Sequence, residues 1–184
     1  MVVWRVVEYA VLIVLLLGVL WFAARLLRVP STRRPGPTVV GSPWVEAGET
    51  FSRLLAEHRR AQLAAAVARH SERLLLPSME QVVPLGQHPG RRPLGERTIP
   101  VQRIIGSADA GSRLFDHKFR PTDLRSRARF ESVYAAMRTG ERLPSIEVFQ
   151  WGGDYFVSDG LHRVAVARAL GQEYLPAEVT QIVA

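Results

Sequence analysis

The sequence contains no cysteine among its 184 residues. Without a thiolate nucleophile, any mechanism in which cysteine attacks the substrate is excluded. The lack of cysteine is also compatible with a reducing compartment. The five histidines show no spacing typical of a metal site, so the sequence predicts no metal centre.

A strong basic excess is missing from most of the chain. Of the net charge of +7, residues 1–47 hold five arginines against two glutamates, which leaves +3 there and +4 for residues 48–184. A surface dedicated to nucleic acid usually carries a larger and more concentrated positive charge. We therefore keep DNA binding or nuclease-like activity only as a second alternative.

A long apolar run lies near the N-terminus, from Tyr9 to Ala24. A helix from Tyr9 to Leu27 would rise about 28 Å, close to the ~30 Å hydrocarbon core of a bilayer. The run is too long for an ordinary signal peptide, so we predict a transmembrane anchor at residues 1–29 that contacts lipid through residues 6–28. Arginines concentrated after the run predict a single-pass protein of the cell membrane with its soluble domain in the cytoplasm.

Three segments are expected between this anchor and the C-terminal domain. Residues 30–48 are rich in Pro, Gly and Arg and predict an extended tether. Residues 49–76 predict an amphipathic helix, from Thr50 to Leu75, that packs on the domain or on a protein partner. Residues 77–96 again contain many Pro and Gly and predict a surface loop.

Residues 97–184 alternate short β-rich runs with helical patterns, which indicates a small α+β domain. The expected elements are a strand over 98–105, a loop over 109–121, a helix over 122–139, and a hairpin of 146–151 with 154–157. Within the loop, Asp109 or Asp116 either holds a metal-bound phosphate or caps a turn. The arginines at 125, 127 and 129 are expected on the solvated side of the helix.

The stretch Tyr155–Gly171 combines a strand, a tight turn and a helix. Aromatic and β-branched residues precede Ser158-Asp159-Gly160, and good helix formers follow as far as the stop at Gly171. Such a helix directs unpaired N–H groups and the positive end of its dipole beyond the turn. With His162 and Arg163 in the first turn, the pattern suits a phosphate or carboxylate, although His162 and Arg163 could equally serve structural contacts.

The segment Asp159-Gly160-Leu161-His162-Arg163 and its flanks resemble the nucleotide-binding segment of the ParB/sulfiredoxin superfamily. Residues 97–107, 143–149 and 175–182 resemble the opening, middle and closing strands of the same family, in the same order. The resemblance implies a small mixed sheet with packed helices, here preceded by the transmembrane helix. Leu161 stands where sulfiredoxins carry their catalytic Cys, which excludes sulfinic-acid reduction.

For function, the resemblance implies a nucleotide-binding site. Its expected contacts are Asp159, Gly160, His162 and Arg163, with Gly106 and Ser107 reaching the ligand from the other side. The expected ligand is CTP or ATP with Mg²⁺, although Leu161 and His162 depart from the Gly-Glu-Arg-Arg pattern of the ParB proteins that bind CTP. Catalytic residues are not identifiable, so nucleotide hydrolysis, kinase and nuclease activities all stay open.

Two readings of different classes result. The first is a membrane-tethered ParB-like domain that binds a phosphorylated ligand, a nucleotide above all, at residues 159–163. The alternative is a catalytically inactive protein-interaction module at the membrane, which docks a protein partner through helix 50–75.

Overall fold

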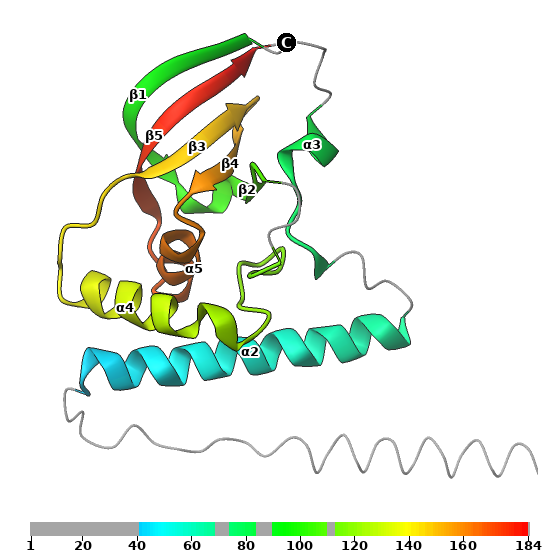
Figure 1. The fold of residues 1–184 in the computed structure, drawn as a ribbon, viewed down its shortest axis with the longest axis vertical. Coiled ribbons are helices and arrows are strands. Elements are labelled where there is room, and N and C mark those ends of the chain that lie inside the picture. Colours follow the sequence, from blue (N-terminus) through cyan, green and yellow to red (C-terminus); the bar gives the residue numbers. More distant parts are fainter. Residues whose placement is uncertain (1–40, 69–73, 84–89, 110–112, 184) are drawn as a thin grey trace, which may run out of the picture. The chain divides into compact units, whose positions relative to one another are not determined.

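A five-stranded mixed sheet organises the protein (Figure 1). The computed structural model describes residues 41–68, 74–83, 90–109 and 113–183. The strands are β1 (Gly90–Pro100), β2 (Ile104–Ser107), β3 (Ile146–Trp151), β4 (Asp154–Asp159) and β5 (Tyr174–Val183). They lie in the order β1-β5-β3-β4-β2, in which β1 with β5 and β3 with β4 are antiparallel and the other two pairs are parallel.

Three helices cover one face of this sheet in layers (Figure 1). Helix α5 (Leu161–Ala169) lies next to the sheet, α4 (Arg127–Arg138) contacts α5, and α2 (Pro43–Val67) contacts α4. The core includes Val148, Val157 and Val179 of the sheet and Val164 of α5, all buried. On the opposite face, the short helix α3 (Met79–Val82) covers a smaller apolar cluster around Phe156.

The hairpin and the closing strand are confirmed. Residues 146–151 and 154–159 pair as β3 and β4, and Gly152 between them has a φ of 59°, which suits a tight hairpin turn. The closing strand, expected at 175–182, is β5. The helix expected over 122–139 begins later, at Arg127, because a short 3-10 helix (η3, Leu124–Ser126) precedes it, with the side chain of Asp123 accepting from the Arg125 N–H.

Helix α2 begins earlier than predicted. It starts at Pro43 instead of Thr50, so the predicted tether at 30–48 ends inside a helix. Proline is favourable in a first helical turn, where its missing N–H would have had no acceptor, so the proline content of this segment did not exclude a helix. The helix ends at Val67, short of the expected Leu75; residues 69–73 lie outside the described residues.

The single strand predicted over 98–105 is wrong. The chain makes two strands there, β1 and β2, which lie at opposite edges of the sheet and are joined by a 3-10 turn (η2, Val101–Arg103). The Arg168 guanidinium donates to the Ile104 carbonyl at 2.6 Å and holds this turn against α5. Most of β1 falls in the predicted surface loop of 77–96, because the prolines of an edge strand resemble those of a loop.

The predicted fold class, an α+β domain preceded by a transmembrane helix, needs correction. Within the described residues the fold is α+β with a five-stranded mixed sheet, and none of the helices there has the length and apolarity to cross a bilayer. Helix α2 is long enough, but acidic and basic residues recur along it. The span predicted at residues 6–28, within the anchor at 1–29, lies outside the described residues.

Candidate binding cleft at the start of α5

The strand, turn and helix predicted around Gly160 are confirmed. Strand β4 ends at Asp159, and α5 begins at Leu161. Gly160 between them has a φ of 109°, and a Cβ there would lie 2.6 Å from Cγ2 of Ile146. Because both the backbone conformation and the space favour glycine, this residue determines the direction in which α5 leaves the sheet.

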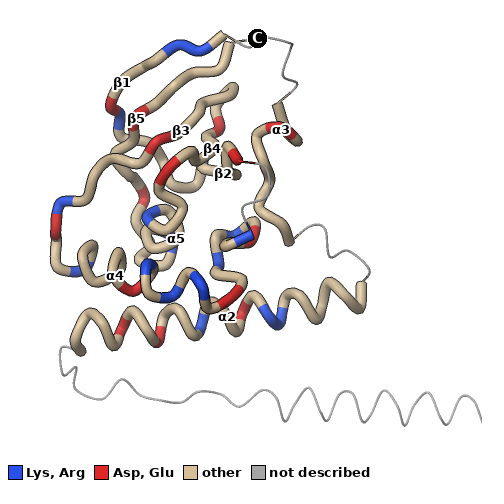
Figure 2. The backbone as a smooth tube through the Cα atoms, in the orientation of Figure 1, with Lys and Arg blue, Asp and Glu red and all other residues tan. Residues whose placement is uncertain are grey.

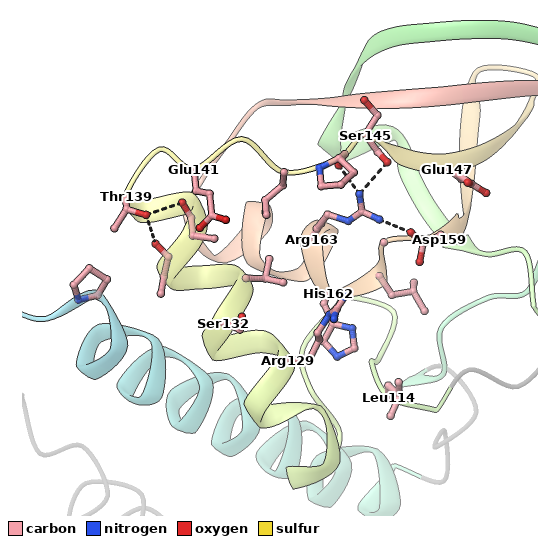
Figure 3. Close-up of a pocket in the computed structure, with 18 of the residues that line it drawn as sticks. Leu114, Arg129, Ser132, Thr139, Glu141, Ser145, Glu147, Asp159, His162 and Arg163 are labelled. Atoms are coloured by element: carbon pink, nitrogen blue, oxygen red, sulfur yellow. Dashed lines mark hydrogen bonds and ion pairs between the residues drawn. The ribbon is translucent and has the colours of Figure 1, made fainter.

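The N-terminus of α5 opens on a cleft of about 810 Å³ (Figure 3). Its walls come from α4, the loop after α4, the ends of β3 and β4, and the first residues of α2. The polar residues that line it are Arg129, Ser132, Thr139, Glu141, Ser145, Glu147, Ser158, Asp159, His162 and Arg163. A cleft of this size is in the usual range for small-molecule sites.

Arg163 lies in the cleft wall, but its guanidinium is occupied. Nη1 donates to the carbonyl oxygens of Pro144 and Ser145, the latter at 2.9 Å, and Nη2 donates to Oδ2 of Asp159 (Figure 3). The side chain is only 13% exposed. Arg163 therefore ties the loop before β3 to the first turn of α5, and it positions the cleft wall more than it offers charge to a ligand.

The His162 side chain has fewer hydrogen-bond partners than the Arg163 side chain. Its ring packs edge to face on Phe115, with centroids 5.1 Å apart. Burial lowers the pKa of His162 below its usual value; the charge of Arg129 lowers it further, and Asp159 partly opposes this. The ring is therefore neutral near pH 7. Its Nε2 is buried and has no hydrogen-bond partner within the described part of the chain.

Arg129 also lines the cleft, which the sequence analysis missed. Basic residues gather at the start of α4 (Figure 2), and all three arginines there were expected in solvent. Arg125 pairs with Asp123 and Arg127 with Glu131, whereas Arg129 lies near His162 (Figure 3).

The spacing of polar residues along α4 could have predicted the position of Arg129. Arg129, Ser132, Ala136 and Thr139 recur at helical intervals and share one face of α4, which borders the cleft. Most side chains on this face are polar, whereas the faces of α4 that contact α2 and α5 are apolar. The arginines at 125, 127 and 129 are all exposed, as predicted, and Arg129 borders the cleft as well.

Gly106 and Ser107 do not line the cleft. A Cβ at Gly106 would collide with the Pro77 carbonyl oxygen, and the Ser107 N–H donates to that same oxygen at 2.9 Å. Ser107 is 2% exposed, and its hydroxyl accepts from the Asp109 N–H at 3.2 Å. These contacts join β2 to the segment before α3, and they use the groups that were expected to reach a ligand.

Acidic side chains are also present in the cleft, namely Glu141, Glu147 and Asp159. Within the described ranges, no group of three or more acidic, histidine or cysteine side chains is arranged to hold a metal ion.

Neither family models nor curated proteins match this chain. The resemblance to the ParB/sulfiredoxin superfamily therefore stays a prediction, and the function has to be argued from the geometry of the cleft.

Proposed function

We propose that the cleft at the start of α5 binds a small phosphorylated ligand, in the first place a nucleotide. One observation carries the proposal: the N-terminus of α5, Arg129 and the ring of His162 border the same cleft, and the buried Nε2 of that ring has no hydrogen-bond partner among the described residues. Each of these groups favours an anion, and Arg129 comes from a different helix than the other two. Their convergence distinguishes this helix start from an ordinary strand-to-helix joint.

The phosphate would lie against the first turn of α5. The N–H groups of residues 161–163 have no acceptor one turn earlier in the helix, and the helix dipole adds positive potential there. Arg129 is exposed and supplies a guanidinium that can bind two phosphate oxygens at once. A neutral His162 in the Nε2–H tautomer can donate one further hydrogen bond without adding charge.

The acidic residues support a nucleotide over a bare phosphate. Glu141 and Glu147 border the cleft together with the N-terminus of α5. Carboxylates accept hydrogen bonds from ribose hydroxyls and from amino groups of bases, and they repel phosphate. A ligand with an anionic part and a separate part rich in donors fits this distribution of charge.

The sequence resemblance points to the same turn. In the ParB/sulfiredoxin superfamily, the segment that 159–163 resembles contacts a nucleotide, so CTP and ATP, each with Mg²⁺, are the first ligands to test. The contacts proposed for this chain differ from the family pattern, because Arg129 replaces Arg163 as the principal arginine for the phosphate.

Thermal unfolding of the full chain with CTP, ATP, ADP and GTP, each with and without Mg²⁺, tests the proposal. A ligand that binds only the native state raises the melting temperature, by an amount that grows with its concentration. We expect a selective rise that is largely lost in Arg129→Ala. Arg125→Ala is the matched control, since it removes the same charge four residues away on an exposed side chain outside the cleft.

No rise with any nucleotide would contradict the proposal, as would a rise of equal size in wild type and Arg129→Ala. Equal loss in Arg129→Ala and Arg125→Ala would indicate that only the total charge matters.

A protein-interaction module is the second candidate, supported by the surface of α2. Two apolar residues near its end, Leu63 and Val67, are 71% and 88% exposed. Exposed apolar side chains on one helix are more typical of a docking surface than of a solvated one. Recovery of a defined partner that survives Arg129→Ala and is lost in Leu63→Ser would favour this candidate over the first.

A further inference from the structure

A second group of polar side chains is buried between α2 and the segment after β2. His58 of α2 is 2% exposed and Asp116 is 1% exposed. Nδ1 of His58 lies 3.0 Å from Oδ2 of Asp116. Neither residue borders the cleft at α5, so their contact has no part in the proposed nucleotide site.

Asp116 is ionised and well satisfied without the histidine. Its Oδ1 accepts from the backbone N–H groups of Lys118 and Arg120, at 2.9 and 3.0 Å, and its Oδ2 accepts from Nε of Arg120 at 2.8 Å. Burial acts to raise the pKa of Asp116, but hydrogen bonds from Arg120 and His58 outweigh it and leave the pKa below the usual value. Asp116 therefore caps a turn, which is one of the two roles that the sequence predicted for it.

The carboxylate of Asp116 determines the tautomer of a neutral His58 ring. A carboxylate can only accept, so the proton of a neutral His58 resides on Nδ1 and Nε2 is left as an acceptor. Nε2 is buried and lacks a hydrogen-bond partner among the described residues. A buried acceptor without a partner costs folding free energy, and proteins rarely retain one without a use.

The ring of His58 borders a pocket of about 340 Å³. Leu74, Leu75 and Phe115 give it apolar walls, and Gln62, Arg113 and Thr122 complete the lining. The Thr122 hydroxyl already donates to the Arg113 carbonyl. This volume is at the lower end of the range for ligand sites, and it is large enough for a molecule of one ring.

We propose that this pocket is a second ligand site, for a small and mainly apolar molecule that carries one hydrogen-bond donor, such as a hydroxyl on a ring. The apolar walls take the body of the molecule, and the donor binds Nε2 of His58. Nε2 is covered in the ligand-free protein. Binding therefore includes a shift of the side chains over it.

Phenol and toluene are suitable probes because they have nearly the same size and only phenol has a donor. The full chain, labelled with ¹⁵N at its histidines, is titrated with each compound and followed by NMR. We expect phenol to shift the Nε2 resonance of His58, which senses hydrogen bonding directly. Toluene should leave that resonance almost unchanged, even where it enters the pocket.

Substitution adds a second readout. His58→Phe keeps an aromatic ring but removes the acceptor, and Asp116 retains its contacts with Arg120 and the backbone. We expect phenol to bind this variant about fivefold more weakly, as the loss of one neutral hydrogen bond predicts, with toluene unaffected. Arg129→Ala is the control, since it alters a residue that borders the other cleft and does not line this pocket, and it should leave phenol binding intact.

Three results would overturn the site: no binding of phenol, equal effects of phenol and toluene on the His58 resonance, or unchanged phenol affinity in His58→Phe. If that variant does not fold, the wild-type resonance decides alone. The nucleotide titration is independent of these results, so either site can fail without the other.

Discussion

The ring of Phe115 meets the imidazole of His162 edge to face, with the two centroids 5.1 Å apart. Phe115 borders the small pocket beside His58, and its neighbour Leu114 borders the cleft at α5. The buried aromatic ring is therefore a wall between the two cavities, and it limits how His162 can turn toward the cleft.

Arg163→Ala is expected to destabilise the fold. The substitution removes the contacts from the guanidinium to two carbonyls of the loop before β3 and to Asp159. For a side chain that is only 13% exposed, this loss should cost about 1–3 kcal/mol of unfolding free energy, which urea denaturation measures. Arg163→Lys keeps the positive charge but lacks the planar guanidinium with its several N–H donors, so it should restore little of the lost unfolding free energy. Full stability of Arg163→Ala would contradict a positioning role.

Gly160→Ala should be among the more damaging substitutions in the turn. The new methyl would lie 2.6 Å from Cγ2 of Ile146 at a φ of 109°, so strain and overpacking add to about 2–4 kcal/mol. Gly171→Ala is the matched control: its φ of 69° is also positive, but a Cβ there would meet no atom within 4 Å. It should cost about 1 kcal/mol. Equal losses in urea denaturation would show that the contact with Ile146 is unimportant.

Acidification through the histidine range should weaken the fold through His162. The folded-state pKa of His162 is lowered by burial and by Arg129, so the unfolded chain binds the proton first as the pH falls. Stability is therefore complete above the unfolded pKa of about 6.5 and decreases as the pH falls below it. The drop in unfolding free energy between pH 7.5 and 5.5 should be smaller in His162→Gln. An identical drop in both proteins would assign the effect to other groups.

Asp116→Asn should cost about 3 kcal/mol, because it leaves the buried guanidinium of Arg120 without its counter-charge. The carboxylate of Asp116 has a lowered pKa, so its contribution is present above pH 4 and is lost as the pH falls through the folded pKa. The penalty of the substitution should accordingly shrink in strong acid. Asp123→Asn, on an exposed cap, is the comparison and should cost less; a reversed order in urea denaturation would refute the argument.

The turn at Gly160, the hairpin around Gly152 and the closing strand were predictable because their signals are local. A glycine between a β-rich run and a helical run restricts the backbone whatever surrounds it. The same holds for residues 146–157, where two strands face each other across a two-residue turn. Predictions that depend on distant parts of the chain were wrong. At residues 98–105 the pattern predicts a single strand, whereas the structure has two strands at opposite edges of the sheet.

The sequence by itself determined the strand, turn and helix on which the candidate cleft is built, together with the residue types in its first turn. Only the tertiary structure decided which of those residues are available to a ligand. The Arg163 guanidinium donates to the backbone carbonyls of residues 144 and 145, whereas Arg129 lines the cleft from another helix. Gly106 and Ser107 contact the segment at Pro77. Side-chain partners depend on chain segments distant in sequence, and a local pattern contains no information about them.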